Sequence, residues 1–299
     1  MKIDAHQHYW HYQAEDLPWI DPSMTVLRQD RLPHDIAPAL AACGIDAVVA
    51  VQARGSLKET EFLLQLAAQH PHIAGVVGWV DLKSSALEKT LESWTAHAVL
   101  CGLRHQLQDE SQLADFLAQA AFNRGVALLQ SRSLVYDLLV LPAQLPLLLK
   151  FCAAHDRHWL VLDHLAKPDL RAPGAAQAIN PAWAAQLRAL GQLPHVVCKL
   201  SGLVTETSAA HTGLTAGLTA GLTAADEQAI LACYDLALEA FGPQRLLFGS
   251  DWPVCALAAP FEVVHGLAQR WAQSRLSDTE QADFWGGNAQ RCYGLKLAA

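Results

Sequence analysis

The sequence lacks several features that would place it in other classes of protein. No apolar run is long enough to cross a bilayer, because charged residues or prolines interrupt the longest candidates. The first residues do not follow the secretion-signal pattern either, since Asp4 and His6 stand where its apolar stretch would run. These absences argue against a membrane protein and lead us to expect a cytoplasmic one.

Paired cysteines and clustered basic residues are also missing. The seven cysteines are scattered singly without Cys-x-x-Cys spacing, and most fall inside apolar segments. This is typical of small buried side chains in a reducing compartment. The formal net charge of −8 and the absence of a basic cluster argue against nucleic acid as a partner. We expect a small-molecule substrate and no organic cofactor, and the sequence leaves a homo-oligomer open.

What the sequence does contain is a regular alternation of apolar stretches and helical periodicity. With 52% hydrophobic residues, the 299 residues suffice for one large core. The expected strands are 2–8, 47–51, 73–80, 99–103, 134–141, 159–163, 196–199 and 245–248. The expected helices are 36–43, 58–70, 87–98, 111–124, one starting near 145, 182–190, 226–241, 261–271 and a C-terminal region. This pattern predicts an α/β protein, a (β/α)8 TIM barrel in a single domain over residues 1–299.

Three segments depart from this regular alternation or leave it ambiguous. Residues 126–130 compete with 134–141 for the fifth strand, and we favour the latter because Pro142 and the leucines after it look like the start of a helix. The aromatic segment Tyr9–Leu32 is long for a loop, so it is expected to wall a pocket or cover the barrel mouth. A low-complexity Gly-Leu-Thr-Ala repeat within 210–225 predicts a structural or mobile loop insertion after the seventh strand.

Polar side chains gather where the predicted strands end. His6 and His8 are two residues apart, so in a strand both rings point to one face, as a metal site or a carbonyl-polarising pair requires. His70 and His72 have the same spacing but precede their strand, at the stability face of a barrel, and are expected to be structural. The other strand ends carry Gln52, Arg54, Trp79, Asp81, Arg104, His105, His164, Lys167, Lys199, Ser201, Asp251 and Trp252. Because the carboxyl ends of barrel strands meet at one face, we expect an active site there.

Five motifs then carry a resemblance to a known family. They are Asp4-Ala-His-Gln-His8, Asp163-His164 with Lys167-Pro168, Lys199-Leu-Ser-Gly202, Gly249-Ser-Asp-Trp-Pro253 and Gly287-Asn-Ala-Gln-Arg291. In this order along the whole chain, the sequence resembles the amidohydrolase superfamily, and most closely its amidohydrolase-2 branch, which contains sugar-acid lactonases. The resemblance implies a hydrolase that opens a sugar-acid lactone, such as an L-fuconolactone or an L-rhamnonolactone, to the aldonic acid.

The resemblance also implies roles for the strand-end residues. Asp251 would take a proton from water and return it to the leaving ring oxygen, while His164, His6 and His8 would stabilise the developing oxyanion. The candidates for binding the substrate are Arg54, Trp79, Arg104, His105, Lys199 and Trp252. Ser201 is a poor candidate nucleophile, because no Gly-x-Ser-x-Gly elbow surrounds it.

The metal pattern of the superfamily is only partly present. Residues 99–106 hold no lysine to bridge two metals, and 134–141 hold no histidine for a single one. His6, His8 and Asp251 remain as ligands that would suit one zinc-like divalent ion, and a site that works without metal stays open. Two alternatives also remain: a metal-dependent nonoxidative decarboxylase, and a hydrolase of a carboxylated lactone, muconate- or pyrone-like, that Arg54 and Arg104 would attract.

Overall fold

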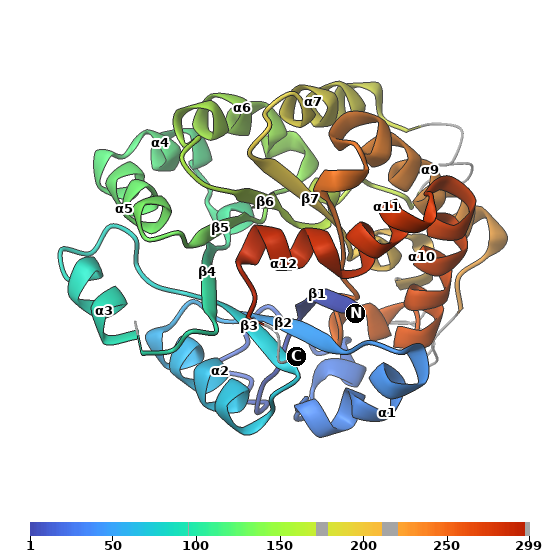
Figure 1. The fold of residues 1–299 in the computed structure, drawn as a ribbon, viewed down its shortest axis with the longest axis horizontal. Coiled ribbons are helices and arrows are strands. Elements are labelled where there is room, and N and C mark those ends of the chain that lie inside the picture. Colours follow the sequence, from blue (N-terminus) through green and yellow to red (C-terminus); the bar gives the residue numbers. More distant parts are fainter. Residues whose placement is uncertain (95, 172–178, 211–220, 297–299) are drawn as a thin grey trace.

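The computed structural model describes residues 1–94, 96–171, 179–210 and 221–296. Its eight strands form one parallel sheet in sequence order, each paired with the next (Figure 1). They are β1 Ile3–Gln7, β2 Ala47–Val51, β3 Ile73–Gly78, β4 Leu100–His105, β5 Val135–Leu138, β6 Leu160–Leu162, β7 Val196–Leu200 and β8 Leu246–Phe248. The predicted barrel is confirmed, and so is the choice of the fifth strand.

The sheet closes between its first and last strands. The backbone N–H of Asp251 donates to the carbonyl of His6 at 2.9 Å, and the N–H of His8 donates to the carbonyl of Trp252 at 2.7 Å. The buried carboxylate of Asp4 reinforces this junction by accepting from the backbone N–H of Ser250 at 2.8 Å. We call this junction the seam.

Helices surround the strands on the outside (Figure 1). They are α1 Pro33–Cys43, α2 Leu57–Gln69, α3 Leu87–Trp94, α4 Leu113–Ala118, α5 Ala120–Ser131, α6 Leu145–Ala154, α7 Pro181–Gly191, α9 Ala224–Phe241 and α10 Phe261–Arg275, followed by α11 Asp278–Ala282 and α12 Asn288–Tyr293. Local sequence sets several ends: the Ser56 hydroxyl caps α2, and Gly44 ends α1 with a φ of +66°.

One expectation on a helix needs correction, and one on a loop lies outside the described residues. The predicted helix 111–124 is two helices that meet at Gln119, whose backbone is extended, and α5 continues to Ser131. The break lets Phe116 and Phe122 pack together, with ring centroids 4.6 Å apart. Residues 211–220 of the predicted insertion lie outside the described residues. Among the residues described, no helix is both long and apolar enough to span a membrane.

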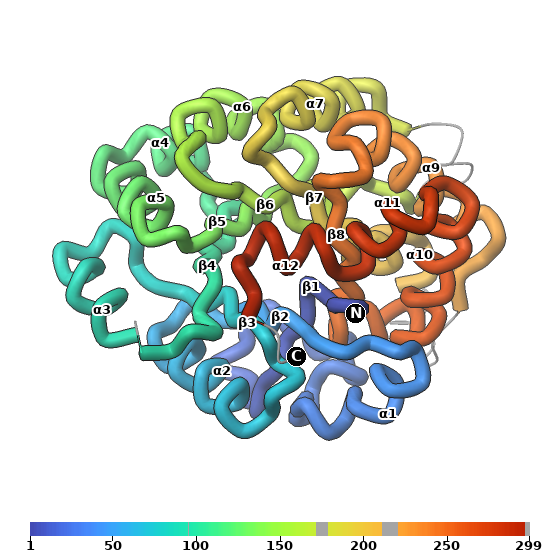
Figure 2. Tube along the Cα trace, viewed as in Figure 1, coloured from blue at the N-terminus to red at the C-terminus, as the bar shows by residue number. Residues whose placement is uncertain are grey.

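The interior of the barrel is layered along its axis. At the N-terminal end of the strands, inward-facing apolar side chains pack against α12, which crosses that end of the barrel (Figures 1 and 2). The contacting residues include Ile3, Ala5, Val49, Val77, Val135, Val161, Val197 and Leu247 from the strands, and Ala289, Cys292, Tyr293 and Leu295 from the C-terminal segment. Charged side chains fill the next layer and position the site above it.

Candidate active site

The two histidines of β1 face the same point inside the barrel, as their spacing predicts. Their Nε2 atoms are 3.1 Å apart, and both rings are buried. Ile3 and Ala5 belong to the interior apolar cluster, so strict alternation would turn His6 away from the axis. The register with β2 shifts between Asp4 and Gln7. An irregularity of this kind re-aims side chains and here accounts for His6 and His8 both facing inward.

Asp251 lies at the seam and completes a three-residue group with these histidines. Its Oδ1 is 3.3 Å from His8 Nε2 and 3.7 Å from His6 Nε2. Its φ is +60°, a backbone region that residues other than glycine rarely adopt. His164 approaches the same oxygen, with its Nε2 at 3.9 Å. The structure therefore brings together the four predicted catalytic residues.

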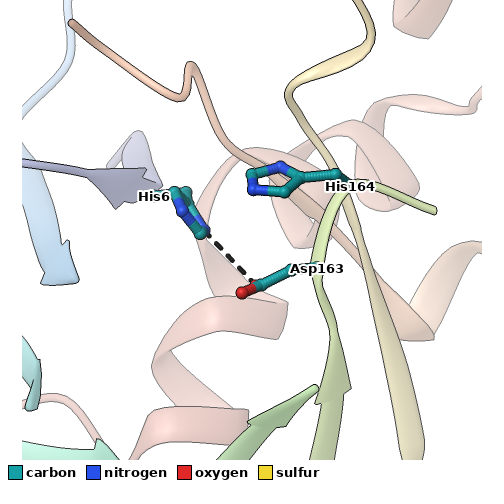
Figure 3. A group of neighbouring side chains, drawn as sticks. All are labelled: His6, Asp163 and His164. Atoms are coloured by element: carbon teal, nitrogen blue, oxygen red, sulfur yellow. Dashed lines mark ion pairs between the residues drawn. The ribbon is translucent and has the colours of Figure 1, made fainter. Parts of the chain in front are cut away.

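An unusual backbone turn presents His164 to the group. Residues 164–167 all have positive φ, between 51° and 57°, although none of them is glycine. This left-handed turn follows β6 directly and lets the consecutive side chains of Asp163 and His164 both point toward His6 (Figure 3). His164 Nδ1 lies 2.8 Å from the Ser201 hydroxyl. Gly202 makes room for the ring, because a Cβ there would lie 2.5 Å from His164 Nδ1.

Burial sets the charge states of this group. Burial lowers the pKa of His164 to about 4, so its ring is neutral at neutral pH. Burial by itself would raise the pKa of Asp251, but the surrounding histidines, His164 foremost, outweigh it and hold that pKa below its ordinary value. Asp251 is therefore ionised at neutral pH beside a neutral His164 ring.

Below these residues lies a buried network of charges. The ammonium of Lys199 is 2.6 Å from Asp137 Oδ2 and 3.0 Å from Asp163 Oδ1, and all three side chains are fully buried. Asp163 Oδ2 accepts from Arg104 Nη1 at 2.8 Å. From α12 the Tyr293 hydroxyl contacts Asp137 at 3.0 Å, so the network spans from the helix at the barrel floor to His6. We call these five residues the sub-site network.

A cavity of about 100 Å³ opens above the histidines. Its lining includes His8, Arg104, His164 and Asp251, at the strand ends where the sequence predicts the site. The other lining residues are Trp19, Ala53, Gln106, Gln108, Asp109, Leu139, Lys167 and Val254. From the aromatic segment Tyr9–Leu32, Trp19 lines the cavity. Trp10, by contrast, is buried in a cluster of apolar residues beside it.

Two of the predicted substrate-binding residues are turned toward protein partners instead of the cavity. Arg54 Nε donates to Glu59 at 2.6 Å, and its Nη1 pairs with Asp16 at 2.9 Å. His105 Nε2 is 2.7 Å from Glu110. The ring of His105 also stacks on Phe116, with centroids 4.9 Å apart. Neither residue is among the described residues that line the cavity.

Three of the remaining four also lie off the cavity wall. Trp79 packs over Gly55 and Trp252 against Tyr9, with the latter ring centroids 5.9 Å apart. Lys199 is fully buried in the sub-site network. Within the described part of the chain, Arg104 is therefore the one predicted substrate-binding residue that reaches the cavity.

The structure also shows site residues that the sequence interpretation missed. Asp137 and Tyr293 complete the sub-site network, and Gln108 accepts a hydrogen bond from Lys167 at 2.9 Å at the cavity wall. A signal for Asp137 was present: it stands two residues after the inward-facing Val135, as Asp163 does after Val161 and Lys199 after Val197.

A larger hollow of about 540 Å³ lies at the opposite end of the barrel, beside the starts of β6 and β7. Its lining includes Asp156, Arg157, His158 and His195. Among the described residues, however, both groups that could hold a metal ion lie at the other end, around His6. Because barrel chemistry takes place at the carboxyl ends of the strands, the smaller cavity is the candidate active site.

The donor atoms at that cavity fit a zinc ion. The Nε2 atoms of His6 and His8 and the Oδ1 of Asp251 are separated by 3.1, 3.3 and 3.7 Å. Tetrahedral zinc with bonds near 2.0–2.1 Å places its ligand atoms about 3.3 Å apart. His8 Nδ1 must carry a hydrogen, because it lies 2.8 Å from the carbonyl of Val51, so its Nε2 presents a lone pair to the same point.

Comparison with known proteins extends these observations. Residues 3–295 match the family model for amidohydrolases. The chain is 50% identical to an L-fucono-1,5-lactonase from Burkholderia multivorans, over 99% of this chain and 96% of that protein. It is 33% identical to an L-fucono-1,5-lactonase from Burkholderia ambifaria, over 98% and 96%. A crystal structure of an amidohydrolase from B. multivorans with bound zinc superimposes with a TM-score of 0.91, at 50% identity over 99% of this chain and 100% of that one.

Proposed function

Because the chain belongs to the amidohydrolase family, we propose that it hydrolyses the ring ester of a sugar-acid lactone of the L-fucono-1,5-lactone type. The observation that supports this most directly is the cluster of Asp251 with three histidines at the cavity, in a chain 50% identical to a lactonase of that name. The product is the open aldonic acid, which releases a proton at neutral pH. The six cysteines buried among apolar residues support a cytoplasmic location.

Asp251 is the general base of the proposed reaction. Its carboxylate takes a proton from a water molecule as the water oxygen forms a bond to the lactone carbonyl carbon, and the carbonyl electron pair moves onto its oxygen. When that pair returns, the bond between the carbonyl carbon and the ring oxygen breaks. Asp251 then returns its proton to the ring oxygen, which leaves as a hydroxyl group of the open acid.

The oxyanion is stabilised by groups that already face the cavity. In the neutral His164 ring, Nδ1 accepts the hydrogen of the Ser201 hydroxyl and Nε2–H is free to donate to the oxyanion. Arg104 adds a fixed positive charge at the same wall, held in place by Asp163 and by the carbonyl of Gln52. These donors are in position before the reaction begins, so little reorganisation is needed.

Zinc has a place in this proposal as an ion held by His6, His8 and Asp251. When bound, it would supply Lewis-acid polarisation and lower the pKa of water. The B. multivorans structure was determined with bound zinc, which supports zinc as the ion that such a group would take.

The substrate hydroxyls are expected to contact the polar side chains of the cavity wall. Gln106, Gln108, Asp109 and Lys167 offer both donors and acceptors there, and the Trp19 ring offers an apolar surface for a sugar face. These four side chains include one acidic and one basic group and carry no net charge, which suits a neutral polyol lactone. Lys199 is buried beneath the histidines and contacts His6, so it is not expected to contact the substrate.

Neither alternative function gains support from the site. A carboxylated lactone would need several unpaired cations, but Arg54 pairs with Glu59 and Asp16, and Arg104 pairs with Asp163. Among the cations of the described lining this leaves only Lys167, which donates to the neutral Gln108. The two curated relatives described above are lactonases and not decarboxylases. Lactone hydrolysis is therefore the function that geometry and similarity support together.

The test is proton release from a panel of L- and D-sugar lactones and dicarboxylate lactones, followed with a pH indicator. We expect acid from an L-sugar lactone, loss of that activity in Asp251→Asn, and retention in the matched control Asp156→Asn at the opposite end of the barrel. Both variants should unfold at temperatures close to that of the wild-type protein. If no lactone yields acid, or if folded Asp251→Asn hydrolyses it at the wild-type rate, the proposal fails.

A further inference from the structure

The Nδ1 atom of His6 lies between two groups with opposite hydrogen-bonding requirements. Lys199 Nζ is 3.1 Å away and, as an ammonium, can only donate. Asp163 Oδ1 is 3.3 Å away and, as a carboxylate, can only accept (Figure 3). The hydrogen of the neutral His6 ring therefore has two alternative positions, and the neighbours on each side decide between them.

On the other side of the ring, His6 Nε2 lies 3.4 Å from Arg104 Nη1, which can only donate, and 3.1 Å from His8 Nε2. The shorter of these two contacts favours one position of the hydrogen. In the neutral His8 ring, Nε2 is an acceptor, because Nδ1–H donates to the carbonyl of Val51. At 3.1 Å it can accept only if His6 Nε2 carries the hydrogen. An uninterrupted chain of donors then runs from Lys199 to His6 Nδ1, from His6 Nε2–H to His8 Nε2, and from His8 Nδ1–H to Val51.

We propose that Lys199 is a positioning residue that sets this tautomer of His6, and that Asp163 supports the opposite tautomer when zinc binds. With the hydrogen on Nε2, His6 has no lone pair that faces His8 and Asp251. Moving it to Nδ1, where it is donated to Asp163 Oδ1, turns the Nε2 lone pair toward the group formed with His8 and Asp251. The inference rests on the zinc ligands proposed above but not on lactone hydrolysis.

The surroundings of Asp163 Oδ1 support its role as the second acceptor. This oxygen is buried and receives no well-directed hydrogen bond from any described residue, although Lys199 Nζ is 3.0 Å away. Beyond this ion pair the oxygen lacks a directed hydrogen bond, and a hydrogen on His6 Nδ1 would supply one. The other carboxylate oxygen is committed to Arg104, which prevents Asp163 from turning away.

Lys199 is equally constrained. Its ammonium is held by Asp137 at 2.6 Å and lies 5.4 Å from the centroid of the Tyr293 ring. Because it stays charged, it donates to His6 Nδ1 and also repels a divalent cation held by the same imidazole. The two tautomers use the same heavy-atom positions, so zinc binding requires a hydrogen to move and the Lys199 contact to be given up, without a rearrangement of the site.

The direct test is two-bond ¹H–¹⁵N NMR on the full-length protein labelled at histidine, with the His6 signals assigned by their loss in His6→Asn. After treatment with chelator, we expect the His6 Nδ1 signal of a bare nitrogen and the Nε2 signal of a protonated one. On addition of Zn²⁺ alone, Nδ1 should become the protonated nitrogen. A protonated Nδ1 in the chelator-treated protein would overturn the proposal, and so would an unchanged tautomer on binding zinc.

Zinc affinity, measured by competition with a chromophoric chelator, separates the two neighbours. Asp163→Asn should weaken binding by about 10- to 100-fold, as losses of such supporting groups do, whereas Lys199→Met should strengthen it. Should Lys199→Met not fold, Lys199→Met/Asp137→Asn removes the cation together with one of its carboxylates. A folded Lys199 variant with unchanged or weaker zinc affinity would refute the inference. No lactone is present in either experiment, so their outcome is independent of the proposed reaction.

Discussion

Replacement of Gly202 by alanine tests whether the position of His164 matters for catalysis. Gly202 has a φ of +68°, and an added Cβ would lie 2.5 Å from His164 Nδ1 and 2.7 Å from Cγ. Both atoms belong to a ring held by Ser201, so the ring has to shift or the backbone has to move. We expect the ring to leave its place beside Asp251.

Gly44 provides a matched control, because its φ is +66° and an added Cβ there would meet no atom within 4 Å. Gly44→Ala therefore carries only the backbone cost of the left-handed region, about 1–2 kcal/mol of unfolding free energy. Gly202→Ala carries this cost and the collision with His164. A displacement of about 1 Å in a catalytic group can cost about 100-fold in rate, so we expect kcat/KM to fall about 100-fold in Gly202→Ala alone.

The assay is proton release with the best lactone of the panel, combined with urea unfolding of both variants. Gly44→Ala should lose stability and keep its kcat/KM. If Gly202→Ala is folded and keeps a kcat/KM within about twofold of Gly44→Ala, then His164 does not need the position that this structure gives it. The role of His164 as an oxyanion donor would then be wrong.

Three further predictions concern residues away from the reacting atoms. Arg54→Gln should leave kcat/KM within about twofold of the wild-type value. It should lower the free energy of unfolding in urea by about 3 kcal/mol, because it leaves the buried Glu59 carboxylate without its cation. A large rise in KM would instead show that Arg54 binds the substrate. Burial, with the nearby Lys2 charge, lowers the pKa of buried His265 to about 4, so between pH 6.5 and 5 only the unfolded state gains its proton. From pH 7.5 to 5 the wild-type protein should therefore lose about 2 kcal/mol more stability than His265→Phe, and equal losses would contradict this. Tyr293→Phe should cost about 2 kcal/mol, because Asp137 loses a donor; no change in the urea midpoint would show that this contact contributes nothing.

The strands could be predicted because their apolar runs are short and regularly spaced. Even the ambiguous fifth strand followed from Pro142, which begins the helical turn before α6. The spacing of His6 and His8 predicts that both rings face one side of the strand, and the carboxyl ends of barrel strands meet at one face, so their convergence with Asp251 could be predicted. The irregularity in β1 that makes this convergence possible has no sequence signal that we recognise.

The partners of the strand-end side chains could not be predicted, because position along a strand fixes the level of a residue in the barrel but not its orientation. Arg54 and His105 both follow or end strands, yet Glu59 and Glu110, each five residues further on, turn them away from the cavity. The left-handed turn was equally hidden, because residues 164–167 contain no glycine to announce it. Such a turn is stable only where surrounding contacts hold it.

Because the seam joins the two ends of the chain, the active site can form only after almost the whole chain has been synthesised. Asp4 and Ser250, whose contact ties β1 to the end of β8, are 246 positions apart in the chain. During translation the two histidines of β1 therefore leave the ribosome long before the carboxylate that completes their group. A nascent chain that has already collapsed around its first six or seven strands has every histidine of the site and no Asp251 beside them. Contacts between such distant segments form late in folding, so recovery of lactonase activity after dilution from denaturant should report the final closure of the barrel and not its earlier collapse.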